Sequence, residues 1–114
     1  MNIATVTQLA ANGKYEEALA AVDSMVSSNP ECACLLVHKA RLIMVQPSTA
    51  GPSLSEAEMC LLRARELDSE SLEAIEELAH FYDAVLPSKE KAAHFAGIFI
   101  ADVNKRLAKI REIG

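Results

Sequence analysis

The segment GKYEEALAAVDSMVSSNP, residues 13–30, decides the fold of this chain. It opens with Gly13, a residue that commonly ends a helix, and a helix-forming run starts at Tyr15. It closes at Asn29 and Pro30, because proline cannot continue a helix. The segment holds no catalytic or metal-binding set of residues. What it does offer is a pattern of helix starts and stops, and such a pattern becomes informative when it recurs.

The pattern recurs at a spacing typical of helical repeats. Ala57 comes 39 residues after Ala18, and Ala92 comes 35 residues after Ala57, each behind a short polar stretch. The loop QPSTAGPS, residues 46–53, can absorb the excess in the first spacing, which leaves a period of about 34 residues. The preceding helices follow the same period, since Val6, Ala40 and Ala79 correspond, as do Leu9, Ile43 and Tyr82.

Apolar periodicity and helix breakers predict five or six helices. The expected ranges are about 2–12, 15–28, 31–46, 53–67, 72–85 and 88–113. Ser53 or Ser55 is expected to cap the fourth helix and Ser88 the sixth, because a serine hydroxyl accepts hydrogen bonds from the first free N–H groups. The loop at residues 46–53 carries two prolines and a glycine and is the one clear interruption.

The composition agrees with a helical protein. The chain has 114 residues, which suits one domain, and 51% of them are hydrophobic, so a packed core is expected. Only 4% are aromatic, while alanine and leucine are frequent. Small side chains let helices approach closely, and the sequence therefore predicts an all-α fold.

Charge and cysteine content narrow the classes of function. A net charge of −5 argues against nucleic-acid binding, which requires a basic surface. No signal peptide is recognisable, and no apolar run approaches the roughly 20 residues that cross a bilayer. Three cysteines, an odd number, do not form a disulfide framework and suit a reducing compartment. We therefore expect a cytoplasmic protein with no membrane insertion and no cofactor.

Three segments resemble the tetratricopeptide repeat, an antiparallel helix pair that stacks into a superhelix. Residues 13–30 resemble the second helix of this repeat. Residues 54–71, LSEAEMCLLRARELDSES, also resemble a second helix and add the small residue Ala64. Residues 72–85, LEAIEELAHFYDAV, resemble a first helix. The resemblance implies a short right-handed α-solenoid of three antiparallel helix pairs, residues 1–30, 31–70 and 71–114, with a long C-terminal capping helix. The chain departs from the family at Lys39 and Phe99, where apolar and small residues are usual, and at Lys89, which replaces an aromatic residue.

The resemblance also implies a concave groove lined by the first helix of each pair. By position, the groove residues are Ile3, Thr7 and Ala10, then Cys34, Val37, Arg41 and Met44, then Glu73, Glu76, His80 and Asp83. We take six of them as partner contacts: Val37, Arg41, Met44, Glu73, Glu76 and His80. Such a groove is apolar at one end and acidic at the other, which fits an amphipathic or basic-tipped peptide or helix. An alternative is that these residues face solvent or a neighbouring subunit.

The chain offers weaker patterns for chemistry. Cys34 and His38 lie four residues apart, as two metal ligands on one helix face would, and further ligands could come from Cys32, Cys60, His80 and His94. No CxxC or HExxH element accompanies them, so a core cysteine and an ordinary histidine are the preferred interpretation. The carboxylates of residues 66–77 are interpreted as a solvated face rather than as an acid–base pair.

The sequence therefore predicts a protein–protein interaction adaptor that is not an enzyme and binds a peptide or helix of another protein. The alternative is an assembly, chaperone-like or self-associating role, for example as a homodimer. Leu107, Ile110 and Ile113 form an apolar stripe that either docks a partner helix or caps the preceding helices. The partner, the pathway, the oligomeric state and the role of residues 46–53 stay open at this level.

Overall fold

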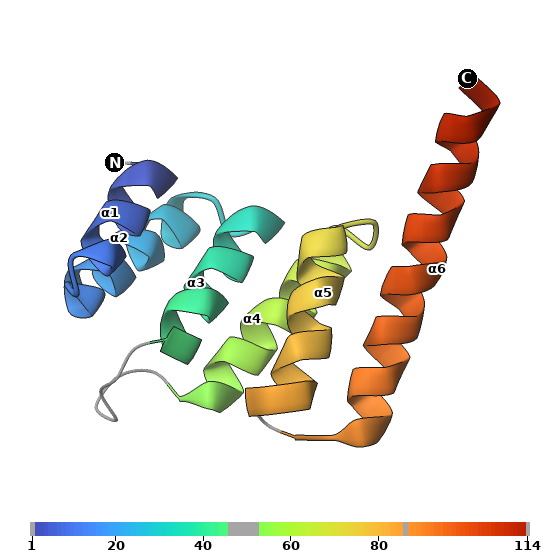
Figure 1. Ribbon diagram of the computed structural model, residues 1–114. Coiled ribbons are helices and arrows are strands. Elements are labelled where there is room, and N and C mark those ends of the chain that lie inside the picture. The colour runs from blue at the N-terminus through green and yellow to red at the C-terminus, as the bar shows by residue number, and fades with distance from the viewer. Residues whose placement is uncertain (1, 46–52, 86, 114) are drawn as a thin grey trace. The chain divides into compact units, whose positions relative to one another are not determined.

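The computed structural model describes residues 2–45, 53–85 and 87–113, and over these residues the chain is helical with no strand (Figure 1). This confirms the predicted all-α class. The elements are α1 (Ile3–Ala11), α2 (Tyr15–Ser28), α3 (Ala33–Val45), α4 (Leu54–Leu67), α5 (Leu72–His80), the π-helical turn η1 (Phe81–Val85) and α6 (Lys89–Ile113). Most of the predicted loop, residues 46–52, lies outside the described residues.

Polar side chains set the helix starts. Ser53 Oγ accepts a hydrogen bond from the Glu56 N–H at 3.3 Å, so Ser53 rather than Ser55 caps α4. Ser71 caps α5 in the same way, and Ser88 accepts from the Lys91 N–H at the start of α6, as predicted. Gly13 lies between α1 and α2 at φ 76°, a left-handed conformation that favours glycine.

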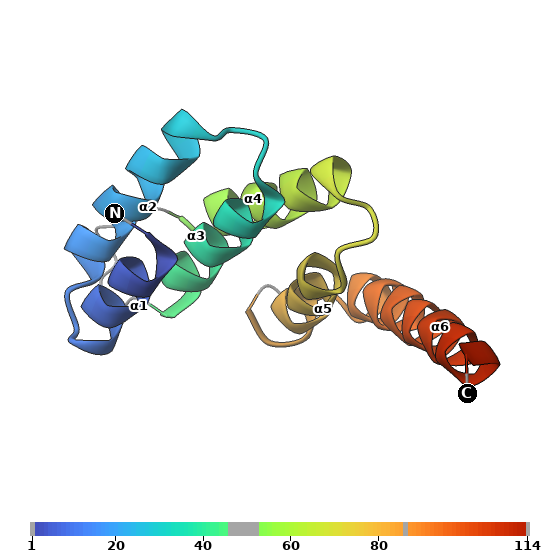
Figure 2. The same ribbon diagram turned by 90° about the horizontal axis from the view of Figure 1, so that it is seen from above.

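The contacts of the chain fall into two compact units, Met1–Ser69 (unit 1) and Glu70–Gly114 (unit 2). In unit 1, α1 packs on α2, α2 on α3 and α3 on α4, and consecutive helices run in opposite directions (Figures 1 and 2).

The core of unit 1 follows the predicted pattern of small and large residues. Ala18, Ala40 and Ala57 are fully buried, and so are Val22 and Leu61, which fill the space between the helices. A residue without a long side chain at the helix crossing lets the two backbones come close, and larger neighbours then interdigitate around it. The alanine spacing read from the sequence thus identifies true packing positions in this unit.

In unit 2, α5 packs antiparallel to α6 (Figure 1). The predicted fifth helix, residues 72–85, differs from the structure because its last turn, Phe81–Val85, is π-helical. Phe81 and Tyr82 are consecutive and both buried, and the Tyr82 ring stacks on Phe95 of α6 with centroids 5.8 Å apart. The wider turn therefore accompanies the burial of two adjacent aromatic rings against the next helix.

Candidate functional site

Unit 2 has a groove between α5 and α6. It measures 430 Å³, and its walls are Ala79, His80, Asp83, Lys89, Ala92, Ala93 and Ala96. We call this surface the α5/α6 groove. Its size falls in the range of ligand-binding clefts in proteins.

Short side chains on both helices create the groove. Ala79 of α5 faces Ala92 and Ala96 of α6, and none of the three extends beyond Cβ. Ala92 is half-buried, whereas its counterparts Ala18 and Ala57 are fully buried. Ala92 therefore lines an open groove, whereas Ala18 and Ala57 are covered by neighbouring helices.

Charged and polar groups stand at the edge of the α5/α6 groove. His80 and Asp83 come from the α5 side, and Lys89 comes from the first turn of α6. The His80 imidazole is 71% exposed, and its Nε2 lies 3.8 Å from Glu76 Oε1, one turn earlier on the same helix. An apolar floor with a few polar groups at its edge suits a polypeptide segment, because the floor buries apolar side chains and the edge selects the flanking charges.

The α3 half of the predicted groove is less open than expected. Val37 is 1% exposed and belongs to the core of unit 1. A side chain buried in this way cannot contact a partner, so the prediction for Val37 is corrected. On a four-helix unit α3 is covered by both α2 and α4, and Val37 points into that core. Arg41 and Met44 are half-buried and Cys34 is exposed, so these side chains remain at the surface of α3.

The six predicted contact residues divide between the two units. Val37, Arg41 and Met44 lie on α3 of unit 1, whereas Glu73, Glu76 and His80 lie on α5 of unit 2. Glu73 is half-buried and Glu76 is exposed. His80 is the member of the set that lines a described hollow, and its neighbours there are the alanines of α6, which sequence reasoning did not assign to a site. The close spacing of Ala92, Ala93 and Ala96 was the signal for them.

Side chains that could bind a metal or act in catalysis are scattered over the described residues. Within these parts of the chain, no three histidine, cysteine or acidic side chains gather as metal ligands would. Cys34 is exposed and Cys60 is buried. Burial raises the pKa of the Cys60 thiol, the nearby carboxylates add to the effect, and the Lys39 ammonium opposes it. A thiol in such a place is a poor nucleophile.

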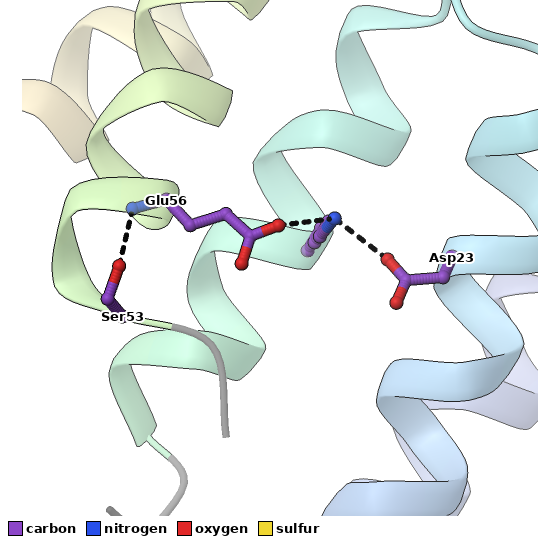
Figure 3. Close-up of polar contacts among 4 residues, drawn as sticks. Asp23, Ser53 and Glu56 are labelled. Atoms are coloured by element: carbon purple, nitrogen blue, oxygen red, sulfur yellow. Dashed lines mark hydrogen bonds and ion pairs between the residues drawn. The ribbon is translucent and has the colours of Figure 1, made fainter. Parts of the chain in front are cut away.

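One polar cluster in unit 1 was not predicted as a contact. Lys39 of α3 places its ammonium 2.8 Å from Asp23 Oδ1 of α2 and 3.2 Å from Glu56 Oε1 of α4 (Figure 3). Its side chain is only 15% exposed. Burial alone lowers the pKa of Lys39, but the two carboxylates outweigh burial and hold the pKa above 10.5. Lys39, which departs from the apolar residue expected at its position, thus joins three helices.

Comparison with models of known protein families gives no match, and neither curated proteins nor solved structures provide a similar chain. Within the described residues, no helix combines the length and the apolar character that crossing a membrane requires.

Proposed function

We propose that this chain is a protein–protein interaction module that holds a helix of another polypeptide in the α5/α6 groove. We also propose that its helices form three TPR-like pairs, α1 with α2, α3 with α4 and α5 with α6, in a short right-handed α-solenoid. The role is one of binding rather than catalysis, and the expected setting is the cytoplasm.

The observation that carries the proposal is the α5/α6 groove itself. Alanines form most of its walls, and helices approach to about 8–10 Å where the contact residues are small. A helix presenting medium-sized apolar side chains could fill the space that the alanines leave. His80, Asp83 and Lys89 at the edge would pair with polar groups beside that apolar face.

Two features support the TPR-like arrangement. Each proposed pair consists of consecutive helices in contact, and the alanines at the predicted crossings of the first two pairs are fully buried. The third pair differs because one face of α6 lines a groove. In stacked helical repeats, such a face is where a further helix packs, which agrees with a helix as the ligand.

A second candidate function is self-association, and exposed apolar side chains on α6 favour it. Leu107 is 42% exposed and Ile110 is 61% exposed. A monomer gains nothing from side chains of this size in water, whereas an assembly would bury them.

The groove can be tested with a synthetic amphipathic helix that carries leucines on one face. Alanine-methyl NMR of the full chain should show shifts at Ala79, Ala92 and Ala96 and none at Ala20, which is exposed on α2. Ala93→Trp should block the groove and weaken binding at least tenfold. Ala101→Trp, on an exposed position of the same helix, is the matched control and should bind as wild type. Equal binding by both variants would contradict the proposal.

The remaining α3 surface has its own test. Arg41→Glu reverses the charge of a half-buried side chain in unit 1 and leaves the α5/α6 groove intact. If the ligand helix occupies only the groove of unit 2, the variant binds the same probe with unchanged affinity. A large loss of affinity would show that α3 contributes contacts as well.

A further inference from the structure

An uninterrupted stripe of apolar positions runs along α6 from the α5/α6 groove to the end of the helix. Its members are spaced by alternating steps of three and four residues, the repeat of a coiled-coil seam. They are Ala93, Ala96, Ile100, Val103, Leu107 and Ile110. We call this set the α6 stripe.

The α6 stripe lies beside the face of α6 that packs on α5. That packed face carries Phe95, which is buried against Tyr82, and Arg106, whose guanidinium donates to the Glu70 carbonyl and contacts Asp102. At 3.6 residues per turn, the α6 stripe is displaced about a quarter turn from these residues. Ile100 is accordingly 59% exposed, and Leu107 and Ile110 are also exposed.

The α6 stripe is divided by size. Its N-terminal half has alanines, which form one wall of the α5/α6 groove, and its C-terminal half has large side chains. If a second α6 lies antiparallel on the first, Leu107 and Ile110 of each copy meet alanines of the other, and the remaining pair lies at the centre. Ala93 then faces Ile110 of the second copy, Ala96 faces Leu107, and Ile100 faces Val103. A single register of the two helices produces all three of these pairs, and the twofold symmetry of the dimer produces each pair a second time.

We propose that the helix held in the α5/α6 groove is α6 of a second copy, packed antiparallel along the α6 stripe. The inference rests on the proposed function, since it names the ligand of the same groove. Each copy's Leu107 and Ile110 would fill the other's alanine-lined wall, so the two contacts are equivalent and the assembly closes as a twofold dimer.

Charges beside the stripe select the antiparallel direction. Glu90 flanks its first turn and Arg111 its last, and no ion pair engages either of them within the described residues. Antiparallel pairing brings Glu90 of each copy beside Arg111 of the other. Parallel pairing would place Arg106 beside Arg111 of the second copy and would set alanine against alanine, leaving gaps.

The size of unit 2 provides a separate reason for a second copy. Its buried apolar side chains are Ala74, Ile75, Leu78, Phe81, Tyr82 and Phe95. A small unit buries a smaller fraction of its surface than a large one, so the burial of further apolar side chains by association would stabilise it. A twofold contact would add Ile100, Leu107 and Ile110 to the core.

An anionic membrane is a poorer occupant for this surface. Membrane-bound amphipathic helices carry basic residues beside a broad apolar face. Here Arg111 lies beside the stripe and Lys89 at the groove edge, but Lys105 and Lys109 lie on the opposite side of α6, by the helical repeat. A flat lipid surface also could not enter the α5/α6 groove, whereas the side chains of a helix could.

Sedimentation equilibrium of the full chain tests the inference. Wild type should show twice the chain mass of 12.3 kDa, with dissociation on dilution. Leu107→Glu should raise the dissociation constant at least tenfold and keep its helical circular dichroism, because the side chain is already partly exposed. Ala101→Glu, on the other side of α6, should dimerise as wild type.

Glu90→Arg and Arg111→Glu should each weaken the dimer, and the double variant should recover it.

Direction is tested by distances between spin labels at introduced cysteines, in a background where Cys32 and Cys34, the two free thiols that are not buried, are changed to serine. In an antiparallel pair, labels at position 112 lie about 30 Å further apart along the axis than labels at position 101. Equal separations at the two positions would overturn the antiparallel arrangement.

The outcomes separate this inference from the proposed function. A monomer at every concentration, combined with normal binding of the synthetic helix, would overturn the second copy as ligand and leave the groove as a helix site. A protein that is monomeric and also does not bind the synthetic helix would overturn both the dimer inference and the proposed function. Binding to anionic vesicles that Leu107→Glu abolishes, with no dimer in solution, would assign the stripe to a membrane instead.

Discussion

Lys39 shows how a single charged residue can hold several helices together. Its ammonium is shared between Asp23 of α2 and Glu56 of α4, and its side chain is only 15% exposed. Side chains of lysine bury their methylene groups and carry the charge to the edge of a core. Removal of the cation would leave two carboxylates facing each other without a partner between them.

Lys39→Met is expected to lower the free energy of unfolding by about 1–2 kcal/mol at neutral pH. The value is modest because the side chains of Asp23 and Glu56 are 50% and 43% exposed, so water screens them. Since the pKa of Lys39 is raised on folding, its contribution is complete below pH 10.5 and is lost as the pH rises through the folded-state pKa. Urea unfolding of both proteins from neutral to strongly alkaline pH measures the difference.

The control is Arg63→Met, which removes the exposed ion pair of Arg63 with Glu66 on α4. This pair should contribute less than about 0.5 kcal/mol. A constant difference between wild type and Lys39→Met across the alkaline range would contradict the role assigned to the ammonium.

At the scale of the element, alanine decides how closely two helices pack. Ala18 of α2 and Ala57 of α4 are fully buried at helix contacts, whereas Ala92 of α6 is half-buried beside the α5/α6 groove. The same residue type therefore serves two purposes. It seals a crossing where another helix covers it, and it leaves a groove where none does.

Ala57→Leu is expected to overpack the contact between α3 and α4 and to cost about 1–3 kcal/mol, because no space exists for the added atoms. Ala20→Leu, on the exposed face of α2, should change stability by less than about 0.5 kcal/mol. Chemical denaturation of the two variants provides the comparison. Equal stability would show that the crossing can expand and that the small residue is not required there.

Helix ends were predictable at this scale because they depend on neighbours in sequence. The second helix was predicted at residues 15–28 and is observed at Tyr15–Ser28, and serine caps set the starts of α4 and α6. The π-helical turn at Phe81–Val85 was not predicted, since it depends on the packing of Tyr82 against Phe95 from a different helix.

At the scale of the whole molecule, the dimer inference predicts a dependence of thermal stability on concentration. Association that occurs only in the folded state stabilises it by mass action, so the melting temperature of wild type should rise with protein concentration. Leu107→Glu should show a weaker dependence over the same range, because its dimer dissociates more readily. Circular dichroism over a broad dilution series measures both. A wild-type midpoint that does not depend on concentration would contradict a dimer linked to folding.

The candidate site was only partly predictable, because exposure depends on what covers a helix. His80 was predicted and lines the groove, but Val37, predicted by the same positional argument, is buried beneath α2 and α4. Periodicity shows which residues share a face of one helix. It does not show whether a second helix, solvent or another chain meets that face.

The sequence by itself determined the helical class, the limits of most helices and the alanines at the crossings of unit 1, because these follow from local hydrogen bonding, caps and side-chain size. The tertiary structure alone decided that Lys39 joins three helices, that Val37 is buried and that Ala92, Ala93 and Ala96 border a hollow. The physical reason is that burial and ion pairing belong to surfaces made by several helices, whose contacts no local pattern specifies.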